Sequence, residues 1–144
     1  MCLAILALVT GIALPRYSRS LSLYRADAAA KRVAADLALA RLTARTTNTS
    51  QQVDFTTPAV GYTLTNSTDP DHPGQTYRVD LSSSPYGAAA VVVALAPAGG
   101  GSAVSKVTFD RYGAAAAGGT IKVTAGDVTR TVSLDVNTGR AAVQ

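Results

Sequence analysis

The side chains that could bind a metal ion lie in and around one short loop. Asp69, Asp71 and Asp80 fall in a twelve-residue window, and carboxylate oxygens are the ligands that Ca²⁺ prefers in such loops. A calcium loop also needs an oxygen ligand at its fifth position and a Glu at its twelfth. Here Pro73 holds the fifth position and Asp80 the twelfth. The match is partial, so we predict no bound metal ion and no cofactor.

The residues needed for catalysis are sparse. His72 is the only histidine and lies in a Pro-rich loop, where a solvent-exposed turn residue is the simpler interpretation. The chain has no G-x-S-x-G nucleophile elbow, and Gly99–Gly101 lacks the G-K-[ST] ending of a phosphate loop. Cys2 is the only cysteine, so it cannot form a disulfide within the chain. We predict that the protein is not an enzyme.

Positive charge is concentrated in the first third of the chain. Residues 1–50 contain seven Arg and Lys against two Asp, whereas residues 51–144 contain six against seven. Arg140 is the only cation after Arg130, and one arginine supplies only one phosphate contact. Arg140 is therefore the one candidate DNA contact, and we do not expect nucleic acid to be a partner.

The chain begins with an apolar run. Cys2 to Leu14 is apolar except for Thr10 and Gly11, but a bilayer-spanning helix needs roughly 20 such residues. A signal peptide would have a basic region before this run and a cleavage site after it, and neither is present. We therefore favour the C-terminal part of a transmembrane helix over residues 1–15, with its first half encoded upstream of Met1. Its membrane and assembly residues would be Leu3, Ile5, Leu6, Leu8, Val9, Ile12, Leu14 and Pro15, with a kink at the proline.

Residues 16–47 have the pattern of an amphipathic helical stem. Apolar residues recur every three or four positions, at Leu23, Ala26, Ala30, Val33, Leu37, Ala40 and Ala44. We expect Leu23, Val33 and Leu37 to pack against the rest of the protein. Arg32 and Asp36 are four residues apart, a spacing that allows a surface ion pair, and we expect both to lie on a solvated face. The helix should end within Thr46–Ser50.

Residues 48–144 predict a β-rich head. The apolar run Ala88–Ala96 indicates a central strand or one buried on both faces, and Asn137-Thr138-Gly139 is typical of a hairpin turn. Short strands at this spacing predict antiparallel sheets packed on the stem, an α+β fold. The expected strands are Gln51–Thr56, Val60–Thr65, Thr76–Leu81, Ala88–Ala96, Val104–Asp110, Thr120–Ala125, Val128–Val136 and Arg140–Val143.

Several stretches resemble a known family. Ala13-Leu14-Pro15-Arg16-Tyr17 resembles the end of the hydrophobic segment of type IV pilins and pseudopilins. The stretch 34–41, with Ala44-Arg45, is similar to the stem of the GspH/FimT class of minor pseudopilins. The C-terminal half of this class is in turn resembled by the segments Val107–Gly113 and Val132–Leu134 and by the ending Thr138-Gly139-Arg140.

The resemblance implies a pilin fold and a structural role in a filament. It implies a single-pass protein of the bacterial inner membrane, with its head in the periplasm, that assembles with other pilin or pseudopilin subunits into a type II secretion pseudopilus or a type IV pilus. A prepilin peptidase would be a partner if a leader is encoded upstream of Met1. Two alternatives stay open, a minor pilin that binds DNA for uptake and a secreted or anchored β-sandwich domain resembling an adhesin.

Overall fold

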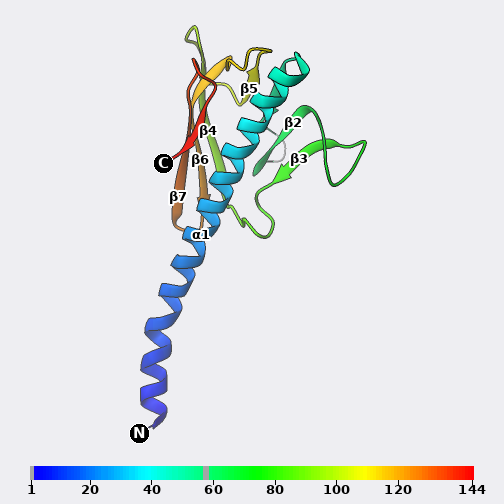
Figure 1. The fold of residues 1–144 in the computed structure, drawn as a ribbon. Helices are drawn as coiled ribbons and strands as arrows, with labels where there is room; N and C mark the ends of the chain where they lie inside the picture. The colour runs from blue at the N-terminus through cyan, green and yellow to red at the C-terminus, as the bar shows by residue number, and fades with distance from the viewer. Residues whose placement is uncertain (1, 57–58) are drawn as a thin grey trace.

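One long helix dominates the computed structural model of the protein (Figure 1). The structure describes residues 2–56 and 59–144, with side chains from Tyr17 onward. Helix α1 runs from Cys2 to Thr47, and its N-terminal half projects beyond the sheets (Figure 1). The side chains predicted to lie in the membrane, from Leu3 to Pro15, fall outside the described ones. Among the residues that the structure describes, no helix is both long and apolar enough to cross a bilayer.

The rest of the chain forms two four-stranded antiparallel sheets. Sheet A has the strand order β3-β2-β1-β5 and sheet B the order β4-β6-β7-β8. Figure 1 shows β2 and β3 on one side of α1 and sheet B on the other. This arrangement confirms the predicted α+β fold. The strands are β1 (Gln51–Asp54), β2 (Gly61–Thr68), β3 (Thr76–Asp80), β4 (Ala90–Pro97), β5 (Lys106–Phe109), β6 (Ala117–Ala125), β7 (Val128–Leu134) and β8 (Ala141–Val143).

The position predicted for the strand in Ala88–Ala96 is wrong. β4 lies at the edge of sheet B and pairs with β6, and Val92 is 57% exposed. An uninterrupted apolar run shows that a strand avoids charge, but it does not fix which strands of the same chain pair with it. The predicted hairpin is present, since β7 and β8 pair on either side of Asn137-Thr138-Gly139.

The core lies where α1 meets the two sheets. Val33 and Leu37 are buried there with Phe109 and Ile121. The packing expected for Leu23 is wrong, because its side chain is 42% exposed. Residues 17–25 are all exposed or half-buried, and Ala26 is the first buried residue of the described part of α1. The β6–β7 turn reaches this level of the helix, since Gly126 lies close to Ser22, but it leaves the Leu23 side chain partly uncovered.

Candidate functional site

A buried polar cluster joins the helix to sheet A. We define the polar cluster as Arg32 and Asp36 of α1, Tyr62 of β2 and Tyr77 of β3. The Tyr62 hydroxyl donates to Asp36 Oδ2 at 2.6 Å, and the Tyr77 hydroxyl lies 3.2 Å from the same oxygen. Arg32 Nε donates to Asp36 Oδ2 at 2.9 Å, and Arg32 Nη2 also contacts the Tyr77 hydroxyl. Asp36 is only 5% exposed, so the solvated position expected for it is wrong.

The environment of the polar cluster keeps both tyrosines protonated. Burial raises the pKa of Tyr62, and the neighbouring Asp36 carboxylate raises it further. The pKa of Tyr77 is raised by the same two causes. Burial alone would lower the pKa of Arg32, but the charge and the hydrogen bond of Asp36 outweigh it and raise that pKa. The neutral tyrosines therefore remain donors to Asp36, and the polar cluster cross-links α1 to β2 and β3.

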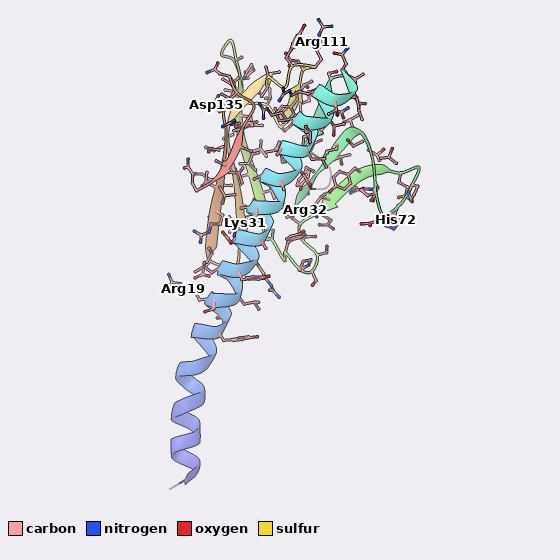
Figure 2. The ribbon with its side chains drawn as sticks, viewed as in Figure 1. Arg19, Lys31, Arg32, His72, Arg111 and Asp135 are labelled. Atoms are coloured by element: carbon pink, nitrogen blue, oxygen red, sulfur yellow. The ribbon has the colours of Figure 1, made fainter. Side chains whose placement is uncertain are left out.

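Sheet B meets the opposite side of α1, largely through small side chains. The helix lies close to β6, β7 and β8, and its buried positions include Ala26, Ala29 and Ala30. Asp27 lies at the border of this contact, 3.7 Å from Arg130 Nε of β7 and 2.7 Å from Lys31 Nζ. The hydrogen bond from Lys31 lowers the pKa of Asp27. Figure 2 shows Lys31 on the side of the helix toward sheet B and Arg32 on the side toward β3.

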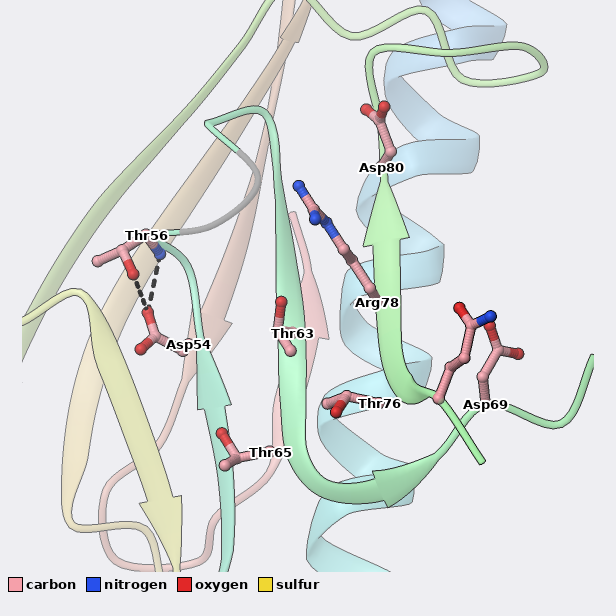
Figure 3. A pocket seen from close by; sticks show the side chains of 9 residues that line it. Asp54, Thr56, Thr63, Thr65, Asp69, Thr76, Arg78 and Asp80 are labelled. Carbon is pink, nitrogen blue, oxygen red and sulfur yellow. Dashed lines mark hydrogen bonds between the residues drawn. The ribbon is translucent and has the colours of Figure 1, made fainter. Parts of the chain in front are cut away.

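A hollow lined by polar side chains lies on the outer face of sheet A (Figure 3). Its volume is about 660 Å³. Arg78 of β3 reaches over its floor, and Asp54 uses one carboxylate oxygen to accept from the backbone and hydroxyl of Thr56 (Figure 3). The lining residues are Asp54, Thr56, Thr63, Thr65, Asp69, Gln75, Thr76, Arg78 and Asp80.

The candidate calcium ligands do not converge in this hollow. Asp69 and Asp80 line it, whereas Asp71 does not. Asp69 accepts from the Asp71 backbone N–H at 2.9 Å, and Asp80 accepts from the Ser82 hydroxyl at 2.6 Å. These hydrogen bonds lower the pKa of Asp69 and Asp80. Within the part of the chain that the structure describes, no three metal-ligating side chains come together.

His72 is an exposed loop residue. Its Nδ1 lies 3.2 Å from Asp69 Oδ2, and its side chain is 66% exposed. The contact joins residues three apart in the same loop, so it closes a local turn and does not reach the polar cluster.

The loop that carries Arg140 lies against an arginine that is distant in sequence. Arg41 Nε donates to the Gly113 carbonyl at 3.2 Å, and the Arg41 side chain also passes close to Gly139. The Arg45 side chain passes close to Gly113 as well. The end of α1 thus brings two arginines to the loops that carry Arg111 and Arg140. The sequence could not show this grouping, because the β5–β6 and β7–β8 loops meet the helix only in the folded protein.

A protein-family model matches most of the chain. The model, described as type II transport protein GspH, matches residues 29–139. The chain belongs to the GspH family. Searches of curated proteins and of solved structures find no match. The GspH family is a family of structural pseudopilins of type II secretion, and the matched region contains the whole polar cluster and both sheets up to the β7–β8 turn.

Proposed function

We propose that this GspH-family chain is a minor pseudopilin that is anchored in the inner membrane and carries its head in the periplasm. It would assemble with other pilin or pseudopilin subunits into a type II secretion pseudopilus or a type IV pilus. The observation that carries the proposal is the family match to the head and upper stem, together with a helix that continues well beyond the sheets (Figure 1).

The apolar run supports the location of the anchor. Residues 2–14 have almost no polar side chains, and an apolar helix end is costly in water but is stabilised in lipid or against other apolar helices. Because the run is shorter than a bilayer requires, we propose that the reading frame continues upstream of Met1. That extension would encode the rest of the span and a leader for a prepilin peptidase.

Substitution in the apolar run tests this proposal. Leu6→Asp should move the protein out of the membrane fraction and abolish complementation of a secretion or piliation defect in a deletion strain, because a charge in a lipid-facing helix is costly. Ser102→Asp places the same charge in an exposed loop of the head and should behave like the wild type. Full complementation by Leu6→Asp, with the protein still in the membrane, would refute the proposed anchor.

DNA capture is a second candidate, favoured by one observation. Arg41 and Arg45 approach the loops that carry Arg111 and Arg140, so this end of the head offers more positive charge than Arg140 alone. Affinity for duplex DNA should then fall steeply with salt concentration, and Arg140→Ala should weaken binding and reduce the salt slope by about 1. Titration of labelled duplex with purified protein at several salt concentrations measures both, and no binding at low salt would eliminate this candidate.

A further inference from the structure

The composition of β4 does not match its position in the fold. The strand Ala90–Pro97 has no charged and no hydroxyl side chain, which is the composition of an internal strand. It nevertheless lies at the edge of sheet B, with β6 as its partner in the sheet. Proteins normally protect an edge strand with charged residues, proline or a covering segment, because an open edge pairs with other strands.

Among the residues that the structure describes, only the upper part of this edge has a covering backbone partner. The Val104 N–H donates to the Leu95 carbonyl at 2.9 Å, forming an isolated bridge between the two residues. Since backbone groups alternate in direction along a strand, those of Val91 and Val93 point to the same outer edge as the Leu95 carbonyl. Leu95 is 1% exposed, whereas Val91 and Val93 pack against the core but remain only partly buried. The open edge is therefore the segment Ala90–Ala94.

The open segment is self-complementary. In an antiparallel pair centred on Val92, Val91 would exchange backbone hydrogen bonds with Val93 of a second copy, and Val93 with Val91. Val92, which is 57% exposed, would then lie directly opposite Val92 of the second copy. A charged strand would repel itself in this arrangement, but residues 90–94 carry no charge.

We propose that β4 is a self-association edge that pairs antiparallel with β4 of a second copy about a twofold axis at Val92. The pairing would join two copies of sheet B into one continuous sheet. It uses the head alone and goes beyond the proposed function, because neither the apolar run nor a secretion partner takes part in it.

Position-specific disulfide formation tests the register. In the full-length protein with Cys2→Ser, Val92→Cys would place two Cα atoms about 4.5 Å apart across the twofold axis, within the range that a disulfide can span. Ala94→Cys is the matched control, since it is an exposed residue of the same strand. In this register Ala94 lies opposite Ala90, so the two Ala94 Cα atoms would be roughly 14 Å apart, too far to cross-link.

Mild oxidation in detergent should convert most of the Val92→Cys protein to a covalent dimer and leave the Ala94→Cys protein monomeric on a non-reducing gel. Equal cross-linking of both variants, or of neither, would overturn the proposal. Helix-mediated association in the detergent cannot produce this difference, because it does not distinguish the two positions.

A charge variant gives an independent readout. Val92→Lys places like charges opposite each other at the axis and should abolish the dimer in sedimentation, while the circular dichroism spectrum stays unchanged because the side chain is exposed. Ala142→Lys adds the same charge to β8, the other edge strand of sheet B, and should leave the dimer intact. A dimer that survives Val92→Lys would also overturn the proposal.

Discussion

Sheet B and the β2–β3 part of sheet A hold the same helix by different physical means. Sheet B approaches α1 closely, against a helix surface rich in alanine. At β2 and β3, sheet A reaches the helix through long polar side chains that converge on Asp36. The apolar contact gains stability from the surface that it removes from water. The polar cluster gains little net energy, because the desolvation of a buried charge offsets much of its hydrogen bonding.

This difference separates stability from specificity in the head. Close packing of small side chains tolerates neither added volume nor charge. The polar cluster instead requires one arrangement, because Asp36 would be left buried and unpaired in any other register of α1 against β2 and β3. Four comparisons of purified proteins test this contrast, ordered from the largest expected effect to the smallest.

A charge at a buried position without partners should have the largest effect. Val33→Asp places a carboxylate at a fully buried site of α1 and should lower the free energy of unfolding by about 4 kcal/mol. Asp36, one turn away, is tolerated because Arg32 and Tyr62 bind it. Ala35→Asp, at an exposed position of the same helix, should change stability by less than about 0.5 kcal/mol. Urea denaturation measures the free energy of unfolding of both variants. Equal losses of stability would contradict the burial of Val33 in an apolar core.

Added volume at the sheet B contact should have the next largest effect. Ala30 is fully buried and lies one turn above Asp27, which pairs with Arg130 of β7. Ala30→Leu should destabilise the head by about 2 kcal/mol through overpacking. Ala38→Leu, at an exposed position of α1, should be nearly neutral. If the two variants have the same thermal unfolding midpoint, sheet B does not approach the helix as closely as described.

Removal of one hydroxyl from the polar cluster should cost less. Tyr62→Phe deletes the 2.6 Å hydrogen bond to Asp36 and should lower stability by about 1.5 kcal/mol, since hydrogen bonds to charged groups are worth about that much. Tyr112→Phe removes a hydroxyl from a side chain that is 70% exposed and should have no measurable effect. If Tyr62→Phe leaves the free energy of unfolding unchanged, the hydrogen bonds of Asp36 are complete without Tyr62.

The pH dependence of the polar cluster should be the smallest effect. The pKa of Tyr62 is raised in the folded protein, so its stabilising contribution is complete below the ordinary tyrosine pKa of about 10. It decreases as the pH rises further, because the unfolded chain releases the proton first. Between about pH 10 and 11 the free energy of unfolding of the wild type should therefore fall by about 1 kcal/mol more than that of Tyr62→Phe. Urea denaturation at each pH measures this difference. If the free energy of unfolding depends on pH in the same way for both proteins, the pKa of Tyr62 is not raised.

Local sequence patterns predicted most of the architecture. The three- and four-residue spacing of apolar residues in the stem predicted the helix and the burial of its alanines, Val33 and Leu37. All eight strands lie within a few residues of their predicted ranges, because alternation, glycine and proline act on neighbouring residues. The GspH/FimT resemblance, drawn from short motifs, is confirmed by the family match over residues 29–139.

Only the tertiary structure decided which partners these elements have. Asp36 and Arg32 have the same spacing as a solvated ion pair, and nothing in the helix reveals that Tyr62 and Tyr77 will cover them from strands 26 and 41 residues away. Leu23 fits the apolar stripe but its side chain remains exposed, and β4 has the composition of a central strand but lies at an edge. The sequence determined what each segment is able to bury, since that depends on its own side chains. What covers each segment depends on contacts between residues that are distant in the chain, and those exist only in the folded protein.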